Sequence, residues 1–201
     1  QMTPELFVVV GPNGSGKSSA IYETELDDSI IFVNPDDIAR SEFADIVDED
    51  ERNYRAWLSC NAQRDALLAE RITFGFETVG SHPSKVEFIK KAKDLGYSVT
   101  VLFVSTEDPR INIERIRQRE LKGGHGVPDE KVIQRYYRTL GLLKDYFEAA
   151  DQIFIWDNTR DAESEEQAQI RELVRKTSEG ITIREEAHDV KWIQEYLLQF
   201  I

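Results

Sequence analysis

A strand-like run that leads into a glycine-rich turn, at residues 6–20, constrains the fold of this chain more than any other stretch. Residues 6–10 are apolar and mostly β-branched, so they predict a buried strand. Residues 11–18 read Gly-Pro-Asn-Gly-Ser-Gly-Lys-Ser and match the P-loop pattern. Glycines let backbone N–H groups converge on an anion, and the helix that follows adds its N-terminal dipole. Because a strand precedes the pattern and a helix follows it, the sequence predicts a nucleoside triphosphate site rather than a chance glycine turn.

The polar residues of this pattern have separate expected tasks. Lys17 supplies the cation for the outer phosphates, and the hydroxyl of Ser18 is the expected protein ligand of Mg²⁺. The rest of the loop and the first helical turn contribute backbone N–H groups. We therefore predict that the nucleotide is bound by Gly11, Asn13, Gly14, Ser15, Gly16, Lys17, Ser18 and Ser19.

The acidic composition limits the partners that the chain is expected to bind. The net charge is −13 for 201 residues, whereas sequence-independent binding of DNA or RNA needs a basic surface. A local basic pocket stays compatible with this charge. The single cysteine, Cys60, excludes an internal disulfide, which favours a cytoplasmic location. Cys60 itself is expected to pack in a helix interface. No run of residues is long and apolar enough to predict a membrane span.

Apolar runs alternate with helical patterns along the chain, which predicts an α/β fold with a mostly parallel, five-stranded sheet and helices on both faces. The expected strands are residues 6–10, 29–33, 73–78, 98–105 and 152–156. The expected helices are residues 16–25, 51–71, 83–95, 109–121, 129–149 and 161–177. A short strand at 181–183 and a closing helix at 186–200, which docks on the body, complete a single domain over 1–201. In such folds the ligand lies at the carboxyl ends of the strands.

Acidic side chains follow two of these strands and are therefore candidates for chemistry. After the second strand, one of Asp36 and Asp37 can cap the next helix while the other takes the proton of an attacking hydroxyl, and we favour Asp36 for the proton. Glu77 ends the third strand and can bind the hydroxyls of an acceptor, bind the water shell of Mg²⁺, or form a structural ion pair. Thr78 is a further candidate for contact with the acceptor.

The helix expected at 51–71 offers polar side chains to the same region. Asn61 and Asp65 project onto its apolar stripe, so they face either a substrate cleft or solvent. The stripe itself, read from helical spacing, predicts burial of Tyr54, Leu58, Ala62, Ala69 and Ile72.

Arginines flank a glycine-rich break at residues 122–128, which is unusual in so acidic a chain. An arginine that closes over a transferring phosphoryl group offsets its charge in a water-poor site. The order helix, glycine hinge, helix therefore predicts a mobile lid over residues 109–140. His125 in the break either touches phosphate or is an ordinary loop residue. We favour Arg115 and Arg119 as catalytic. The whole set of arginines is Arg115, Arg117, Arg119, Arg135 and Arg138.

Motifs of other P-loop classes are absent from the sequence. No Asn-Lys-x-Asp segment is present to read guanine, which disfavours a GTPase, and no Leu-Ser-Gly-Gly-Gln segment marks a transporter-type ATPase. A standard Walker B strand is missing too, and Phe-Gly-Phe-Glu at 74–77 is a poor substitute. Small-molecule kinases often lack a standard Walker B strand, so its absence is compatible with that class.

With these residues in place, the chain resembles the zeta toxin family of P-loop kinases, and within it the compact bacterial members. The P-loop is generic, whereas Gly-Gly-His-Gly-Val-Pro and Arg-Tyr-Tyr-Arg-Thr-Leu are more specific to the family. The matching stretches occur in the family's order and are residues 11–18, 34–39, 76–78, 123–128, 135–140 and 157–159.

This resemblance implies a nucleotide-kinase-like fold, ATP with Mg²⁺ as the donor, and a hydroxyl of a UDP-activated amino sugar as the acceptor. Carried over by position, the family's catalytic aspartate falls on Asp36 and its acceptor-binding glutamate on Glu77. The P-loop lysine falls on Lys17 and one lid arginine on Arg115. Two departures stand out: the residues after Glu77 differ, and the family's second lid arginine falls on His125. That second role then passes to another arginine, the candidates being Arg119 and Arg135.

The sequence thus predicts an ATP-dependent kinase that phosphorylates a hydroxyl of a small molecule. One alternative is a polynucleotide 5′-kinase, which the net charge of −13 disfavours. A second is a non-enzymatic ATP-binding module that acts through a protein partner, which the intact Lys17, Ser18 and Asp36 disfavour. A protein antitoxin or another regulator is a further expected partner.

Overall fold

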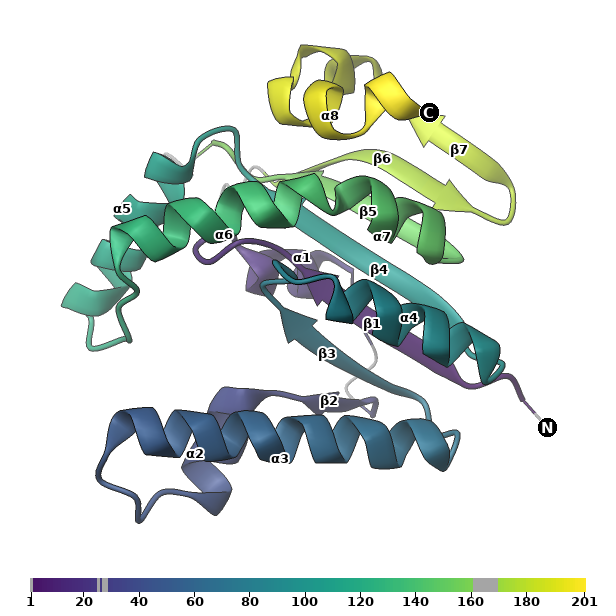
Figure 1. Cartoon of the computed structure of the whole chain (residues 1–201). Helices are drawn as coiled ribbons and strands as arrows, with labels where there is room; N and C mark the ends of the chain where they lie inside the picture. Colours follow the sequence, from purple (N-terminus) through teal and green to yellow (C-terminus); the bar gives the residue numbers. More distant parts are fainter. Residues whose placement is uncertain (1, 25, 27–28, 161–169) are drawn as a thin grey trace.

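The fold is built on a parallel sheet, which confirms the predicted α/β class. A computed structural model describes residues 2–24, 26, 29–160 and 170–201. The parallel strands are β1 (Glu5–Val10), β2 (Ile31–Val33), β3 (Phe74–Thr78), β4 (Ser98–Ser105) and β5 (Gln152–Asp157) (Figure 1). Their order in the sheet is β2-β3-β1-β4-β5, so the P-loop strand lies between β3 and β4. Each of these five strands overlaps one of the strands predicted from the sequence.

Two further strands extend the sheet beyond β5, so the predicted count of five strands is wrong. They are β6 (Arg171–Thr177) and β7 (Gly180–Ile183), and both pair antiparallel. The helix predicted over 161–177 is therefore wrong at 171–177, and its residues 161–169 lie outside the described residues. The polar composition of 171–177 hid this strand. It forms because it pairs with the edge of β5 and buries Leu173 and Val174 there.

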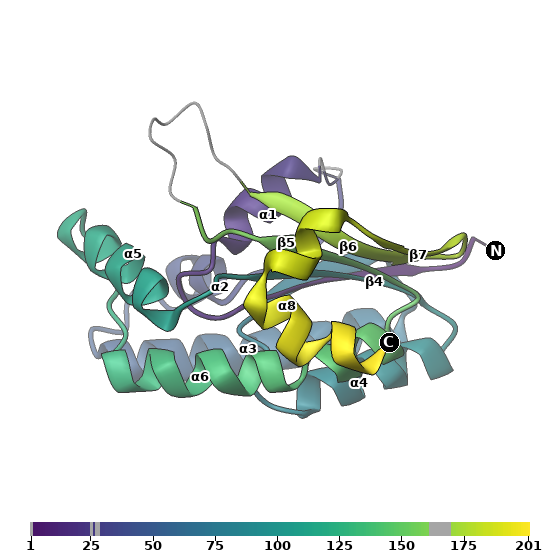
Figure 2. The same cartoon turned by 90° about the horizontal axis from the view of Figure 1, so that it is seen from above.

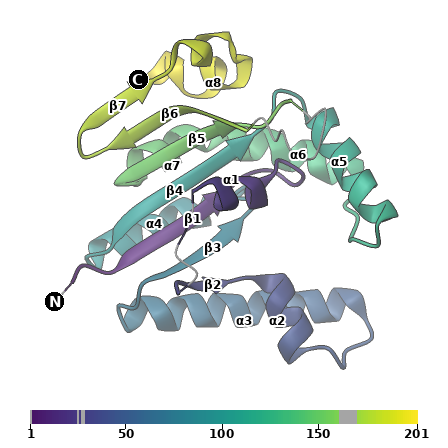
Figure 3. The same ribbon diagram turned by 180° about the vertical axis from the view of Figure 1, so that it is seen from behind.

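Helices cover both faces of the sheet. On one face lie α3 (Glu49–Ala69), α4 (Ser84–Asp94), α6 (Asp129–Gly141) and α7 (Leu143–Ala149) (Figure 2). The opposite face carries α1 (Lys17–Glu23), which lies in front of the sheet in Figure 3. The pair α2 (Pro35–Glu42) and α3 flanks β2, and α5 (Pro109–Leu121) projects past the carboxyl ends of the strands (Figure 1). None of the helices in the described ranges combines the length and the hydropathy needed to cross a membrane.

The chain after β7 closes over the body as short helical pieces rather than as one helix. These pieces are η1 (Glu185–Asp189), α8 (Lys191–Tyr196) and η2 (Leu198–Phe200). Val190, Ile193 and Leu197 are buried in the main core, whereas Phe200 is exposed. The helix predicted at 129–149 is likewise divided into α6 and α7, yet the apolar face expected of it is buried throughout, at Val132, Tyr136, Leu140, Leu143 and Phe147.

The apolar stripe predicted for α3 is wrong. Tyr54 and Leu58 are exposed, as are Ala62 and Ala69, and Ile72 lies beyond the end of the helix. The stripe that faces the core is instead Ala56, Cys60, Arg64 and Leu68, four residues apart. An arginine on the inner face hid this stripe, because it reads as a solvated position. Cys60 is fully buried, as predicted.

Candidate active site

The P-loop connects β1 to α1 and is packed closely by segments far away in the chain. Gly14 and Gly16 have φ values of +76° and +91°, a region that disfavours any side chain. A Cβ on Gly14 would also lie 2.5 Å from the backbone oxygen of Asn112, and one on Gly16 would overlap the side-chain amide of Asn158. The loop therefore tolerates only glycine at these two positions.

The backbone of this loop presents N–H groups that the described part of the chain does not use. Within it, no hydrogen bond is donated by the backbone N–H of Asn13, Gly14, Gly16, Lys17 or Ser18. The N–H of Ser15 is the exception, because it donates to the oxygen of Pro12 at 3.1 Å. Consecutive N–H groups at a helix start form a nest for an anion, so this arrangement fits the phosphates of a nucleotide.

Lys17 is held against the same loop. Its Nζ donates to the oxygen of Gly11 at 2.8 Å. Burial lowers the pKa of Lys17 to about 8, and the charge of Glu77 opposes this shift while those of Arg119 and Arg135 add to it. The fold thus brings Lys17, Glu77 and Arg119, all predicted for the site, to one place.

A network of side chains from other elements fixes the shape of the loop. Asn112 of α5 donates to the oxygen of Asn13 at 2.9 Å, and its own oxygen accepts from Thr106. Asn158, just after β5, donates to the oxygen of Ser15 at 2.9 Å. Sequence reasoning missed both asparagines as parts of the site. Asn158 had a signal, because it follows a strand in the predicted order, whereas nothing marked Asn112.

Three of the five arginines around the glycine break reach the P-loop region. Arg115 donates to the oxygen of Asn158 at 2.8 Å, and Arg135 donates to the side chain of Asn13 at 3.2 Å. Arg119 is exposed but lies close enough to lower the pKa of Lys17. The other two are exposed, and Arg117 pairs with Asp129 at 2.6 Å.

Asp36 begins α2 with a carboxylate that makes no hydrogen bond or ion pair within the described residues. The cap of α2 is Asn34, whose side chain accepts from the N–H of Asp36 at 2.9 Å. Asp37 pairs with Arg40 at 2.6 Å. Neither aspartate side chain caps the helix, and only that of Asp36 is uncommitted.

Glu77 and Thr78 end β3 beside the P-loop strand. The oxygen of Thr78 accepts from the N–H of Gly11 at 3.2 Å, and its hydroxyl accepts from the N–H of Gly80 at 3.1 Å. Glu77 is partly buried and forms no ion pair within 4.0 Å among the described residues, which speaks against the structural ion pair. Its charge acts on Lys17 instead.

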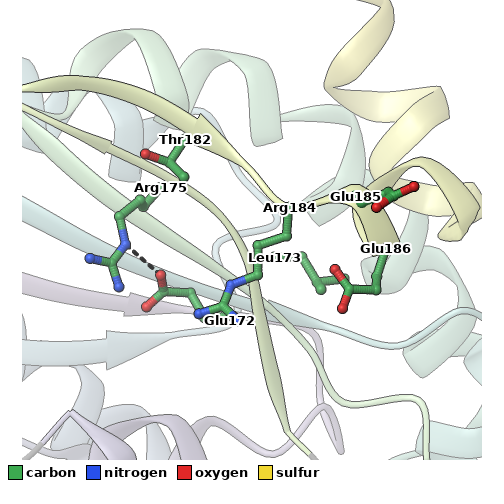
Figure 4. Close-up of a pocket in the computed structure, with 7 residues that line it drawn as sticks. All are labelled: Glu172, Leu173, Arg175, Thr182, Arg184, Glu185 and Glu186. Atoms are coloured by element: carbon green, nitrogen blue, oxygen red, sulfur yellow. Dashed lines mark hydrogen bonds and ion pairs between the residues drawn. The ribbon is translucent and has the colours of Figure 1, made fainter.

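A cavity of about 480 Å³ lies elsewhere, between β6, β7 and η1 (Figure 4). Charged side chains line it, among them Arg175, Arg184 and Glu186, and Glu172 pairs with Arg175 at 2.6 Å. No residue predicted for the nucleotide or the acceptor lines this cavity. The P-loop strand β1 and this cavity therefore lie on opposite sides of β5 in the sheet.

The sequence comparisons agree with this geometry. A model of the zeta toxin family matches residues 1–170. A Haemophilus influenzae protein described as uncharacterized is 29% identical over 132 residues, which make up 63% of this chain and 88% of that protein.

Solved structures share the fold at low sequence identity. One, from the PezAT chromosomal toxin-antitoxin system of Streptococcus pneumoniae, has a TM-score of 0.57 and 18% identity, and the match covers 82% of this chain and 72% of that one. Another, the AvrRxo1-ORF1:ORF2 complex with ATP, has a TM-score of 0.69 and 13% identity over 96% of this chain and 63% of that one. At such identities the likeness shows the fold, which is that of P-loop kinases.

Proposed function

Because the chain belongs to the zeta toxin family, we propose that it is an ATP-dependent kinase that transfers the γ-phosphate to a hydroxyl of a small molecule, with UDP-amino sugars as the first acceptor class. One observation carries the proposal. The charges of Glu77, Arg119 and Arg135 all act on Lys17, in a loop where the N–H groups of Asn13, Gly14, Gly16, Lys17 and Ser18 are unused within the described chain. The uncommitted carboxylate of Asp36 completes the set.

The P-loop holds the donor in this proposal. Its N–H groups bind the phosphates, and the Lys17 ammonium turns from the oxygen of Gly11 to the outer phosphates. Mg²⁺ fits as a partner of the nucleotide, because it commonly keeps several waters and binds substrate phosphates with few protein ligands. Ser18, exposed in the first turn of α1, would hold the ion, which neutralises charge on the phosphates when bound.

The transfer step needs a base, a positioning group and a charge clamp. Asp36 takes the proton from the acceptor hydroxyl, whose oxygen bonds to the γ-phosphorus as the bond to the β–γ bridging oxygen breaks and ADP leaves. Glu77 positions the acceptor, with Thr78 beside it. Arg115 and Arg119 offset the charge on the transferring group. The proposed lid is residues 109–140, which span α5, the loop after it and most of α6.

A protein antitoxin or regulator is the proposed macromolecular partner. The support is the family itself and the toxin-antitoxin system in which one structural neighbour occurs. The acidic charge of −13 favours a protein over nucleic acid as that partner.

The test measures ATP consumption against a panel of acceptors, UDP-N-acetylglucosamine among them, for the wild type and Asp36→Asn. Stimulation by one acceptor in the wild type alone supports the kinase and gives its substrate class. Stimulation by a 5′-hydroxyl oligonucleotide alone would favour the polynucleotide kinase. ATP binding without stimulation by any acceptor would favour the non-enzymatic module.

A further inference from the structure

The end of the chain lies beyond the stretch that the zeta toxin family model matches, which stops at residue 170. This tail, residues 171–201, forms β6, β7, η1, α8 and η2. It extends the sheet past β5, and α8 packs against α6 (Figure 1). Val174, Ile193 and Leu197 of the tail are buried in the main core. The tail is therefore a packed part of the body and can hold a side chain in a fixed place.

Two side chains of the tail donate to one buried carboxylate. Asp157, the last residue of β5, is 1% exposed. Its Oδ1 accepts from the indole N–H of Trp192 at 2.9 Å, and its Oδ2 accepts from the guanidinium of Arg171 at 2.9 Å. Trp192 is itself buried and stacks on Phe103 of β4, with the ring centres 6.2 Å apart. The tail thus supplies both the positive charge and a further hydrogen bond that a buried carboxylate needs.

A second connection runs from the tail to the start of α5. Glu107 directly precedes Asp108, the N-cap of α5, and its side chain accepts from the backbone N–H of Lys191 at 3.2 Å. The N–H of Glu107 donates to the hydroxyl of Thr159 at 3.0 Å, and this hydroxyl donates to Asp157 Oδ1 at 2.6 Å. The tail therefore ties the end of β5 to the beginning of α5.

The residue between Asp157 and Thr159 belongs to the candidate active site. The side chain of Asn158 donates to the P-loop oxygen of Ser15 at 2.9 Å. Its backbone oxygen accepts from Arg115 of α5 at 2.8 Å. Because the residues on either side of it are held by hydrogen bonds, Asn158 is fixed in the position from which it contacts both the loop and the arginine.

We propose that Trp192 and Arg171 are positioning residues of the proposed nucleotide site. They fix Asp157, and this holds Asn158 where it contacts the P-loop and Arg115. The inference rests on the proposed kinase function. Without a donor from the tail, the carboxylate of Asp157 would be buried and incompletely paired, which is costly, so it would turn to another donor or to solvent. Such a turn would move Asn158, the next residue, away from the loop.

The first experiment measures ATP binding by calorimetry, which needs no acceptor and no transfer step. Trp192→Phe removes the indole N–H but keeps an aromatic ring beside Phe103, and Trp57→Phe makes the same change at an exposed position of α3. We expect about tenfold weaker ATP binding for Trp192→Phe and unchanged binding for Trp57→Phe, because a hydrogen bond to a charged group is lost.

Thermal unfolding of both variants separates positioning from loss of folding, since the titrations are made well below each Tm. Wild-type affinity for ATP in Trp192→Phe would overturn the inference, even if its Tm were lower, because Trp192 would then only stabilise the fold.

The second experiment tests whether Trp192 acts through Asn158. A double-mutant cycle compares the effect of Trp192→Phe in the wild type and in Asn158→Ala. In Asn158→Ala we expect Trp192→Phe to weaken ATP binding by less than about twofold, because the residue that it positions is gone. In Arg135→Met, which removes a separate contact with Asn13, the loss should stay about tenfold. Equal losses in these two variants would overturn the inference.

Arg171 offers a further test, because it carries the charge that faces Asp157. Arg171→Met, checked for folding by thermal unfolding, should weaken ATP binding at least as much as Trp192→Phe, and Arg171→Lys should restore part of the affinity. Equal affinities in the two Arg171 variants and the wild type would overturn its role. ATP binding that depends on Trp192 and Arg171, without transfer to any acceptor, would support the inference and count against the kinase. Transfer by the wild type, with ATP binding unchanged in every tail variant, would overturn the inference and leave the kinase standing.

Discussion

The proposed donor region and the proposed acceptor region of this molecule are built in different ways. The P-loop is shaped by backbone geometry and by hydrogen bonds from Asn112, Asn158 and Arg135, which come from three distant segments. On the proposed acceptor side, the carboxylate of Asp36 makes no hydrogen bond or ion pair within the described residues. The proposed donor site is therefore organised in advance, whereas the acidic residue proposed for the acceptor side is uncommitted in the free protein. Substitutions should therefore affect ATP binding and transfer to the acceptor separately.

The largest difference between the effect on transfer and the effect on ATP binding is expected for Asp36→Asn. Loss of a general base should lower the rate of phosphoryl transfer by about 10²- to 10⁴-fold, because the attacking hydroxyl keeps its proton. The affinity for ATP should stay within about twofold, since Asp36 is not part of the P-loop network. Single-turnover transfer and ATP titration measure the two quantities. Asp37→Asn, which breaks only the exposed pair with Arg40, is the control, and equal losses in the two variants would remove Asp36 from the mechanism.

Gly16→Ala is expected to weaken ATP binding, which Asp36→Asn should leave nearly unchanged. The new Cβ would meet the amide of Asn158 at a φ of +91°, so the loop must shift and the ATP affinity should fall about 100-fold. Gly180→Ala is the matched control, because its φ is +124° but its Cβ would meet nothing within 4 Å. Calorimetric ATP binding distinguishes the two. Normal affinity in Gly16→Ala would mean that the close packing of the loop is not needed.

Loss of Arg135, a cation near Lys17 that is not one of the proposed pair of Arg115 and Arg119, should weaken transfer more than donor binding. Arg135→Met removes the contact with Asn13 and a cation near Lys17, so kcat should fall at least about tenfold. Arg138→Met, an exposed position on the same helix, should leave kcat unchanged. If Arg119→Met lowers kcat less than Arg135→Met does, the second lid role belongs to Arg135 rather than to Arg119.

The donor half should also respond to pH through Lys17. Its pKa is lowered to about 8 in the free protein, so the ammonium that binds phosphate is present below pH 8 and is lost above it. The Kd for ATP should therefore rise above pH 8, by at most about tenfold per pH unit. ATP titrations from pH 7 to 9.5 test this. Lys17→Arg keeps its charge and should show a flat profile, whereas an equally steep profile in that variant would exclude Lys17 as the titrating group.

The smallest effect is expected where the proposed lid meets the acceptor side. His125 Nδ1 lies 2.7 Å from Glu49 Oε1 at the start of α3, and both side chains are largely exposed. Exposed pairs contribute about 0–1 kcal/mol, so Glu49→Gln should change the acceptor KM by less than about fivefold. Steady-state kinetics at low and high salt measure the change. A loss of kcat as large as that of Arg135→Met would show that this contact has a direct role in transfer.

The elements with strong local signals were predicted from the sequence. β1 and β4 are runs of apolar, β-branched residues, and α5 begins with Asp108 and Pro109, a cap and a first-turn residue. The inner stripe of α3 could not be found in this way, since Arg64 there is stabilised by Phe76 from another element. Residues 171–177 form a strand because β5 offers them an edge, which no local pattern shows.

Within the site, the P-loop could be predicted from the sequence alone, because its glycines and Lys17 lie close together in the chain and their chemistry is local. It also placed Asp36 and Glu77 after strands, which puts them at one end of a parallel sheet. The hydrogen bonds to the loop from Asn112, Asn158 and Arg135 could be found only in the folded structure. Only it packed the guanidinium of Arg64, from α3, over the ring of Phe76 in β3. The physical reason is that these contacts join segments far apart in the chain, so their free energy depends on how the helices pack on the sheet.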